Sequence, residues 1–391
     1  MRVDVLIFGG GASGLWCLDR FRRAGYHALL LEAKALGAGQ TIQAQGIIHG
    51  GGKYALRGVR DFAAVRATSK MPSRWRMSLN GTTEPSLAGT EVLSDSCHLW
   101  LPRGSLLAKA QSWGLMSVIA HAGLLANPPI KVDKPCWPAI LRDAALAVYA
   151  LKEDVISTGS FLQTLAAIHD GYIYLYDAAR SRFKGDAFEL EDVRIDARAT
   201  VLTAGAGNAA LLQRAGIRDE IMQCRPLKMV LLRGALPSFF GHCVVGGKTR
   251  LTITTPVAGI WQIGGEIAER LAHEDDLKMA RQSALQEIRR WIPGLDLSAT
   301  EIALYAAERA EARTSDLRRP SGVHARYVTP KLVAAWPTKL CLTPVLADEV
   351  FALVSAQLKA PAVSKHEEPP PWPKPALARY PWEEIEWFSA A

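Results

Sequence analysis

The most constraining feature of the chain is a glycine-rich turn that directly follows an apolar run. Residues 3–8 are apolar enough for a buried parallel strand, and they lead into Gly9-Gly10-Gly11-Ala12-Ser13-Gly14. A helical pattern at 15–24 and a second apolar run at 28–31 follow, and Glu32 ends that run. Strand, glycines, helix, strand and acid therefore occur in the order of a dinucleotide-binding unit. A glycine-rich turn with a chance acidic residue is the alternative interpretation.

Each residue of this unit has a predicted task. Gly9 allows the tight turn, Gly11 lets the backbone approach a pyrophosphate, and Gly14 lets the helix pack close to the strand. The N-terminal N–H groups and the dipole of that helix favour phosphate. Glu32 is expected to accept hydrogen bonds from ribose hydroxyls.

The composition restricts what can surround the unit. The chain has 391 residues, of which 49% are hydrophobic and 21% charged, which predicts a sizeable core divided between two domains. The net charge of +8 suits anionic substrates, cofactor phosphates or nucleic acid, but the basic residues are interspersed with acidic ones. The densest basic stretches, residues 66–76 and Arg318, Arg319 and Arg326, are interpreted as solvated faces.

Cysteine spacing and targeting signals exclude further classes. The six cysteines show no CxxC spacing, so we expect reduced, mostly buried thiols and no metal site. The first predicted strand begins at Val3, which leaves no room for a signal peptide and favours a cytoplasmic protein. The most apolar long stretch, 112–130, is interrupted by His121, Asn127 and two prolines, and is interpreted as a buried or lid segment rather than a membrane span.

A second glycine-rich stretch, residues 37–54, contains Thr41, Gln45, Gly46, Ile48 and His49. Frequent glycines let a backbone lie against a flat ligand, and the interleaved polar side chains offer donors and acceptors to ring edges. A mobile surface loop is the alternative, although the apolar pair at 47–48 is unusual for one.

The rest of the chain predicts alternating elements. An apolar strand from Ala199 ends in a glycine turn at Ala204 and Gly205, and Asn208 starts the next helix. This turn is a second place where the backbone can approach a ligand at the carboxyl edge of the same sheet. We further expect strands at 99–101, 117–121, 172–176, 193–195, 227–233, 251–255, 260–263 and 332–336, and helices at 154–165, 275–291 and 345–357.

These elements predict an α/β chain, α+β overall. A Rossmann-like dinucleotide-binding domain is expected from residues 1–60, 150–225 and 325–360. It is interleaved with a substrate domain that has a mixed or antiparallel sheet, at 61–149 and 226–324. Residues 361–391 read as an extended tail rich in Pro and Trp, expected to wrap the protein surface more than to recruit a partner.

With these motifs in that order, the sequence resembles the D-amino acid oxidase superfamily of FAD-dependent oxidoreductases. The resemblance rests on residues 9–14 with Glu32, on 37–54, on 199–208 and on 331–344, and covers most of residues 1–360. Within it, residues 45–54 are similar to the segment that passes beside the flavin in flavin-linked glycerol-3-phosphate and L-2-hydroxyglutarate dehydrogenases.

The resemblance implies FAD as the cofactor and a set of residues that bind it. Gly9, Gly11 and Gly14 would contact the pyrophosphate, and Glu32 and Lys34 the adenosine ribose region. Residues 41–49 would flank the flavin, 204–205 the adenosine end, and 338–340 the pyrimidine side. The full expected set is Gly9, Gly11, Ala12, Ser13, Gly14, Glu32, Ala33, Lys34, Thr41, Gln45, Gly46, Ile48, His49, Ala204, Gly205, Asn208, Thr338, Lys339 and Leu340.

Three residues are candidates for catalysis. His49 is the natural general base if the substrate is an alcohol, with a structural hydrogen bond as its alternative role. Lys339 would stabilise a reduced, anionic flavin. The family's carboxylate-binding Arg is matched by Arg309 or Arg313, and Arg313 is the choice here because Thr314 and Asp316 follow it; a surface ion pair is the alternative.

The leading functional hypothesis is oxidation of a small anionic 2-hydroxy acid or amino acid by hydride transfer to flavin N5. A tRNA-modifying flavin enzyme that acts on an aminomethyl group, and an FAD-bound protein without catalysis, are the alternatives. Oxygen and a quinone both stay open as electron acceptors.

Overall fold

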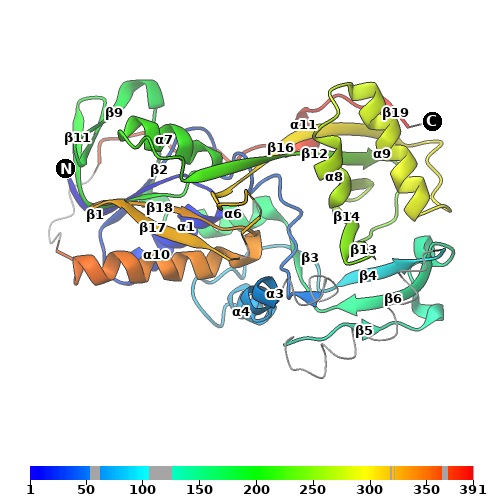
Figure 1. Ribbon diagram of the computed structural model, residues 1–391. Helices are drawn as coiled ribbons and strands as arrows, with labels where there is room; N and C mark the ends of the chain where they lie inside the picture. Colours follow the sequence, from blue (N-terminus) through cyan, green and yellow to red (C-terminus); the bar gives the residue numbers. More distant parts are fainter. Residues whose placement is uncertain (53–61, 105–125, 318, 321, 363–368, 391) are drawn as a thin grey trace.

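The computed structural model describes residues 1–52, 62–104, 126–317, 319–320, 322–362 and 369–390. The expected strand at 117–121, most of the apolar stretch 112–130, and Lys53 and Tyr54 lie outside these residues. The described chain forms two large sheets that lie beside each other and one small two-stranded sheet, and the long strands β12 and β16 run from one large sheet toward the other (Figure 1).

The first sheet has β1 at its centre, as the apolar run near the start of the chain predicts. β1 pairs in parallel with β11 and β2, and β11 and β2 pair in parallel with β18 and β8. Val5 and Ile7 face one side of the sheet and Leu6 and Phe8 the other, so both faces must be covered. The strands are β1 (Arg2–Phe8), β2 (Ala28–Glu32), β8 (Ile173–Leu175), β9 (Ser181–Lys184), β10 (Ala187–Leu190), β11 (Val193–Leu202), β17 (His324–Thr329) and β18 (Leu332–Trp336).

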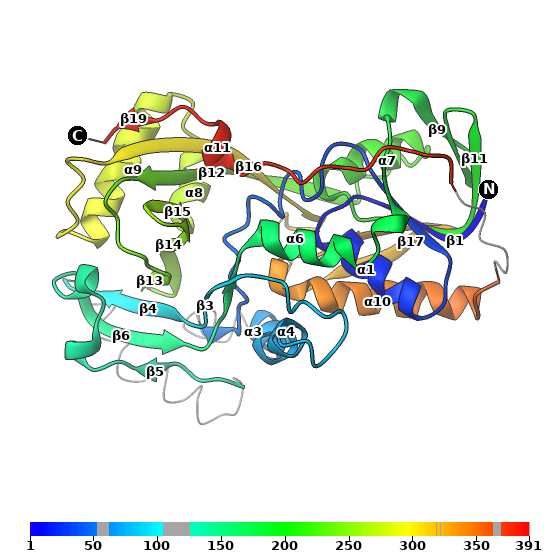
Figure 2. The same cartoon turned by 180° about the vertical axis from the view of Figure 1, so that it is seen from behind.

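Helices cover one face of this sheet, and the β9–β10 hairpin with a short helix covers the other (Figures 1 and 2). The helices of the first face are α1 (Ala12–Arg23), α6 (Thr158–Ala167) and α10 (Thr343–Leu358), and α7 (Asn208–Arg214) lies on the second. In the described part of the chain, the stretch Leu340–Leu358 has the length and apolar composition of a membrane span, with 44% of its apolar window buried. Its buried side chains share a core with α1, as those of a core helix do.

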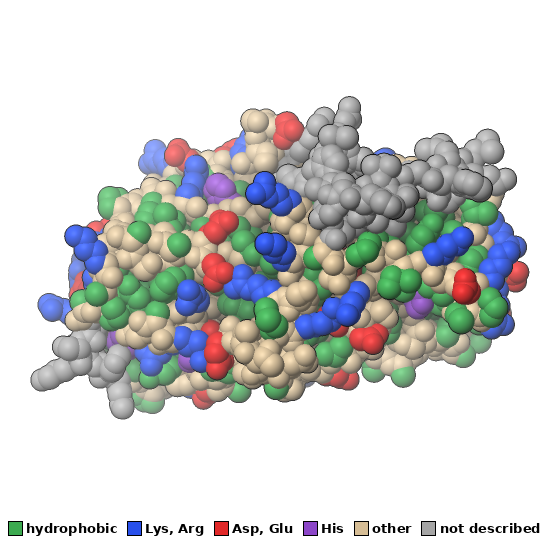
Figure 3. All heavy atoms as spheres, turned by 90° about the horizontal axis from the view of Figure 1, so that it is seen from below, with side chains coloured by type: hydrophobic (Ala, Val, Ile, Leu, Met, Phe, Trp, Pro, Cys, Tyr) green, Lys and Arg blue, Asp and Glu red, His purple; other side chains and the backbone are tan. Residues whose placement is uncertain are grey.

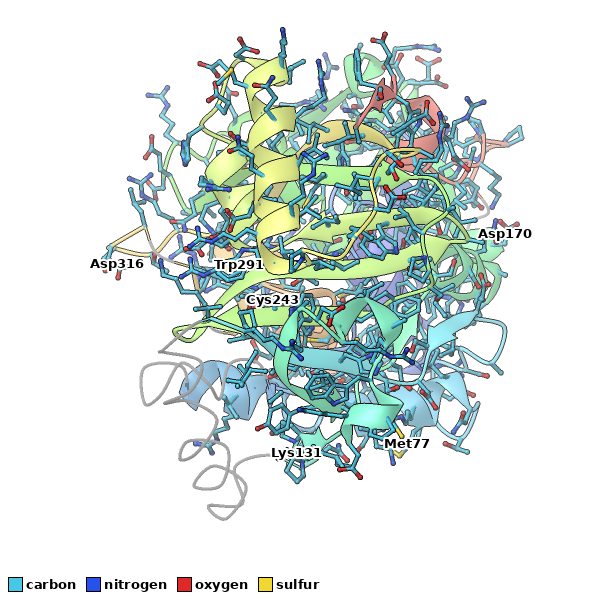
Figure 4. All side chains as sticks on the ribbon, turned by 90° about the vertical axis from the view of Figure 1, so that its right-hand side faces the viewer. Met77, Lys131, Asp170, Cys243, Trp291 and Asp316 are labelled. Carbon is cyan, nitrogen blue, oxygen red and sulfur yellow. The ribbon has the colours of Figure 1, made fainter. Side chains whose placement is uncertain are left out.

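The second sheet is mainly antiparallel, with one parallel pair between β13 and β4. Its order is β19-β16-β12-β15-β14-β13-β4-β6-β5. In Figure 4 the helix α9 lies in front of this sheet, with Trp291 at its lower end and Cys243 just below that end. The elements are β4 (Cys97–Pro102), β5 (Ile130–Lys131), β6 (Ala145–Leu151), β12 (Met222–Arg233), β13 (Gly241–Val245), β14 (Lys248–Val257), β15 (Ile260–Gly264), β16 (Glu301–Ala312), β19 (Phe388–Ser389), α8 (Glu266–Leu271) and α9 (Leu277–Trp291).

Smaller elements connect and flank the sheets. A short antiparallel pair, β3 (Val92–Ser94) and β7 (Val155–Ile156), lies between them, and Ile47 bridges to Val155. The remaining helices are α3 (Phe62–Thr68), α4 (Met71–Leu79) and α11 (Pro381–Glu384), with short 3-10 helices at Lys134–Cys136, Ala139–Leu141, Asp170–Tyr172, Ala178–Arg180, Gly205–Gly207 and Leu340–Leu342.

Helix starts differ from their predicted positions for identifiable reasons. The helix expected at 154–165 begins at Thr158, because the Ser157 side chain caps it by accepting from the Ser160 N–H, and 155–156 belong to β7. The helix expected at 275–291 begins at Leu277, with Asp276 as its cap. The strand β16 has no predicted counterpart.

Residues 369–390 of the tail run along the surface of both sheets (Figure 2). Leu377 bridges to Leu36 beside the first sheet, and β19 pairs with β16 at the edge of the second. Between these points Tyr380 reaches α6, where its hydroxyl accepts from the Gly159 N–H at 2.7 Å.

Candidate functional site

A cavity of about 1120 Å³ lies where the carboxyl edge of the first sheet meets the second sheet. Ligand pockets for small molecules usually enclose about 300–1,000 Å³, so this one has room for a large cofactor together with a substrate. Most residues predicted to bind the cofactor line it, namely Gly9, Gly11, Ala12, Ser13, Glu32, Ala33, Lys34, Thr41, Gln45, Gly46, His49, Ala204, Gly205, Thr338, Lys339 and Leu340.

The glycine turn after β1 is shaped by close backbone contacts. Gly9 has a φ of +103°, and a Cβ there would lie 2.5 Å from the Ala204 Cα. A Cβ on Gly14 would lie 1.9 Å from the Gly9 carbonyl oxygen, so any side chain would push α1 away from β1. Gly14 does not line the cavity, and its position matches the packing role expected of the third glycine.

The start of α1 presents its backbone to the cavity. Gly11 is the N-cap, and the Ala12 N–H donates to Thr41 Oγ1 at 3.1 Å. Glu32 is fixed by two backbone donors, the Gly10 N–H at 2.5 Å and the Lys34 N–H at 2.8 Å. A carboxylate offers about four acceptor positions, so two such bonds leave capacity for hydroxyl donors.

Two predicted contact residues support the site from behind. Asn208 is fully buried; its Oδ1 accepts from the Ala204 N–H, and its amide N–H groups donate to the Leu202 and Ala335 carbonyls. It thereby fixes the turn after β11 to β18. Ile48 is fully buried in the core beneath α1 and lies outside the lining of the cavity.

The glycine-rich loop after β2 joins the two sheets. The Gln45 side-chain amide donates to the Thr252 and Gln262 carbonyls, both at 2.9 Å. Gln40 Oε1 accepts from the Ala310 N–H at 3.1 Å. Gly46 has a φ of +70°, and a Cβ there would lie 2.0 Å from the Ile156 carbonyl oxygen. The hydrogen bonds of Gln40 and Gln45 therefore hold this loop in place, which disagrees with its alternative interpretation as a mobile surface loop.

Two threonines near the start of α10 turn polar atoms to the cavity. Thr338 and Thr343 line it, and their Oγ1 atoms are buried without a hydrogen-bond partner among the described residues. Buried polar groups are nearly always paired, so these hydroxyls fit a ligand that supplies donors or acceptors. Lys339, next to Thr338 in the sequence, also lines the cavity.

His49 lines the cavity in front of two buried side chains. Its Nδ1 lies 3.2 Å from Glu153 Oε2, and Glu153 Oε1 accepts from the Gly50 N–H at 2.7 Å. His242 Nε2 lies 3.9 Å from the same Glu153 oxygen, and its Nδ1 is 3.0 Å from Thr252 Oγ1. Glu153 and His242 were not singled out from the sequence, because Glu153 lies in the loop between β6 and β7 and His242 lies on β13, with no recognisable spacing between them.

The arginines of the site differ from the sequence prediction. Arg313 does not line the large cavity; it is exposed, just beyond β16, and pairs with Glu220 at 2.5 Å in a small separate pocket. Arg309, the alternative, lies within β16 and lines the large cavity, 3.5 Å from Glu269. The structure therefore places Arg309, and not Arg313, on the wall of the large cavity.

Arg319 also departs from its expected place on a solvated face. It lines the cavity, and its Nε is buried without a hydrogen-bond partner among the described residues. Elsewhere on the surface, basic, acidic and apolar groups are intermixed, as the face in Figure 3 shows.

Comparison with known proteins agrees with this arrangement. The family model DAO, described as FAD dependent oxidoreductase, matches residues 4–319. A probable FAD-dependent oxidoreductase of Pseudomonas aeruginosa is 36% identical over 98% of both chains, and its crystal structure superposes with a TM-score of 0.80 at 32% identity over 98% of both chains.

More distant structures share the fold. Glycine oxidase from Geobacillus kaustophilus has a TM-score of 0.65 at 16% identity, over 93% of this chain and 97% of its own. L-alpha-glycerophosphate oxidase from Mycoplasma pneumoniae, with FAD bound, has a TM-score of 0.65 at 14% identity, over 97% of this chain and 100% of its own.

Proposed function

This chain belongs to the D-amino acid oxidase family of FAD-dependent oxidoreductases, and on that premise we propose that it oxidises a small anionic substrate at a carbon bearing a hydroxyl or an amine. FAD supplies the hydride acceptor for this reaction. The observation that carries the proposal is that one cavity is lined by the glycine turn of the dinucleotide unit, by His49 and by Arg309.

The residues present fit the cofactor along its whole length. We assign the pyrophosphate to the start of α1, at Gly9 and Gly11, and the adenosine ribose to the carboxylate of Glu32. Thr338, Lys339 and Leu340 would hold the pyrimidine side, where the buried Thr338 hydroxyl needs a partner. A positive charge at Lys339 would favour the reduced flavin anion.

The opposite part of the cavity would bind the substrate. Arg309 and Arg319 offer planar guanidinium groups, which pair well with carboxylate or phosphate. Met229 and Leu227 add apolar surface on the β12 side. A substrate held by its anion against these arginines can present its reacting carbon toward His49, which orients the hydroxyl or amine.

The test is an anaerobic titration of the purified, FAD-loaded protein. The visible absorption bands of the flavin should bleach on addition of a small hydroxy acid or amino acid, and neutral analogues without the anion should act much more weakly. Flavin bands that no such compound bleaches would instead support a macromolecular substrate such as a modified tRNA, or a protein without catalysis, and would refute the proposal.

A further inference from the structure

We infer that Glu153 holds His49 in the form of a general base, and that the substrate carbon therefore bears a hydroxyl rather than an amine. This inference rests on the proposed function, because it assigns the chemistry of the same cavity. It comes from three side chains, those of His49, Glu153 and His242, whose nitrogen and oxygen atoms lie within 4.8 Å of one another.

The orientation of His49 follows from its contact with Glu153. The His49 side chain is 14% exposed and lines the cavity, whereas that of Glu153 is only 3% exposed and lies behind it. An ionised carboxylate only accepts hydrogen bonds, so the His49 Nδ1, 3.2 Å from Glu153 Oε2, must carry the proton of a neutral ring. The lone pair is then on Nε2, which is the nitrogen that takes a proton from a substrate.

The surroundings of Glu153 favour its charged form. A buried charge is costly unless it is paired and hydrogen-bonded. Its second oxygen accepts from the Gly50 N–H at 2.7 Å, and the fully buried His242 faces the first oxygen at 3.9 Å. The neighbouring carboxylate of Asp154 pairs instead with Arg76 at 2.9 Å, so it belongs to a different ion pair.

A general base formed by His49 and Glu153 is needed for the oxidation of an alcohol but not for that of an amine. An amine with a lone pair can lose hydride without a base, whereas an alcohol must release its hydroxyl proton as the carbonyl forms. With FAD bound as the hydride acceptor, the C–H bond would break and its hydrogen would leave with the electron pair, the O–H proton would go to His49 Nε2, and the C–O single bond would become double. The imidazolium that results is stabilised by Glu153.

Histidine and glutamate side chains also bind metal ions, so a metal site formed by His49, Glu153 and His242 is the competing interpretation. A zinc ion would need each ligand atom at about 2.0–2.2 Å from the metal. Two ligand atoms of one tetrahedral zinc ion are therefore roughly 3.3–3.6 Å apart. The 3.2 Å between His49 and Glu153 suits such a site as well as a hydrogen bond, whereas the 3.9 Å from His242 Nε2 to Glu153 Oε2 is longer than a shared zinc ion allows. If the purified holoprotein contains one equivalent of a transition metal that His242→Asn removes, the relay assigned here is wrong.

The tautomer of His49 can be measured without any substrate. In the FAD-loaded protein labelled with 15N-histidine, NMR should show His49 as the Nδ1–H tautomer, with His49→Asn used for assignment. In Glu153→Gln the amide N–H groups can donate to Nδ1, so we expect the proton to move to Nε2. An Nε2–H tautomer in the wild-type protein, or no change in Glu153→Gln, contradicts the role of Glu153.

The rate of anaerobic flavin reduction tests the chemistry. Glycerol 3-phosphate, lactate and 2-hydroxyglutarate are the hydroxyl probes, and glycine, alanine and proline are the amine probes. We expect a hydroxyl probe to reduce the flavin, and Glu153→Gln to slow the limiting rate roughly 100- to 10,000-fold. The half-saturating concentration should stay within about threefold, because Glu153 does not line the cavity.

Asp154→Asn is the matched control, since it makes the same change of a buried acid at the next residue. Its limiting rate should stay close to that of the wild-type protein. Faster reduction by an amine probe, or equal loss of rate in both variants, overturns the inference while the proposed function stands. A flavin that no probe reduces refutes the proposed function and the hydroxyl assignment together, while the NMR result still decides the role of Glu153.

Discussion

Arg309 and Arg313 lie close together in sequence, but only Arg309 reaches the large cavity. We expect Arg309→Ala to raise the half-saturating concentration of an anionic substrate about 10- to 100-fold, because a hydrogen bond between charged groups contributes about 1.5–3 kcal/mol. Arg313→Ala removes only an exposed pair with Glu220, and such pairs contribute about 0–1 kcal/mol. Steady-state kinetics on both variants checks this; a larger effect in Arg313→Ala would return the clamp to its predicted position.

The contact at Gly14 makes a second residue-level prediction. A Cβ there would lie 1.9 Å from the Gly9 carbonyl oxygen, so Gly14→Ala must shift α1 from β1. Overpacking of this kind costs about 1–3 kcal/mol, and the shift should also lower the FAD content of the purified protein.

Gly294→Ala is the control, because a Cβ at Gly294 meets nothing within 4 Å. Thermal unfolding and the ratio of flavin to protein absorbance measure both effects. A Gly14→Ala protein with normal FAD content would contradict the role of this contact.

Six cysteines, all without disulfides, differ in their access to solvent. Cys17 and Cys243 are fully buried, and burial raises the pKa of both thiols well above the usual value. The thiolate is the reactive form, so these residues should not react with a thiol reagent in the folded protein.

Cys136 and Cys224 are exposed and should be labelled first, with Cys224 the slower because burial raises its pKa too. Mass spectrometry of protein treated with Ellman's reagent near neutral pH gives the order. Labelling at Cys17 before Cys136 would contradict the burial described here.

At the residue scale, the sequence predicted the parts of the site that depend on local backbone. The close approach at Gly9, the packing at Gly14 and the position of Glu32 follow from one continuous motif. Glu153, His242 and Arg319 could not be found in this way, because they reach the site from separate strands or loops. Arg313 was chosen over Arg309 from flanking residues, and sequence alone does not show which of the two faces a cavity.

At the scale of elements, α6 depends on a contact with the tail. The Tyr380 hydroxyl accepts from the Gly159 N–H in the first turn of α6 and lies 3.2 Å from Ser157 Oγ. Tyr380→Phe leaves this N–H without its acceptor, so we expect the free energy of unfolding to fall by about 1–3 kcal/mol.

Tyr327→Phe is the matched control for that change. The Tyr327 hydroxyl is buried and has no hydrogen-bond partner among the described residues, so its removal should leave stability unchanged or slightly higher. Urea unfolding of the two variants gives the comparison. Equal destabilisation of both would mean that the tail contact contributes nothing specific.

The elements themselves were predicted to different degrees. β18 lies at residues 332–336 as expected, because it is a short apolar run between polar segments. β16 was missed because its sequence, rich in Ala and Glu, favours a helix by propensity. Its pairing with β12 along its whole length overrides that preference, and such pairing is not visible in a local window.

At the scale of the whole molecule, the cavity is lined by parts of both sheets. A ligand that binds the folded state but not the unfolded chain stabilises the protein, by about 4 kcal/mol at a free concentration of 1,000 times Kd. We therefore expect removal of FAD to lower the melting temperature, and added FAD to raise it in a concentration-dependent way.

Differential scanning fluorimetry on the apoprotein with increasing FAD measures this, with flavin-free nucleotide ADP as the control for the adenosine end alone. ADP should give a smaller shift, because it cannot reach the wall at Thr338 and His49. If added FAD does not change the melting temperature of the apoprotein, the cofactor site assigned to this cavity is wrong.

The order of strands in the first sheet has a consequence for synthesis on the ribosome. β1 and its neighbour β2 emerge early, but β11, which pairs with the other edge of β1, and β18, which pairs with the outer edge of β11, follow only after residues 193 and 332 have been made. Until β11 is made, the nascent chain carries an apolar strand with one unpaired edge, which is a template for aggregation. A premature stop codon before β11 would leave that edge of β1 open for good, and one between β11 and β18 would leave the edge of β11 open. Truncated products should therefore need chaperones or be degraded rather than persist as partly active fragments.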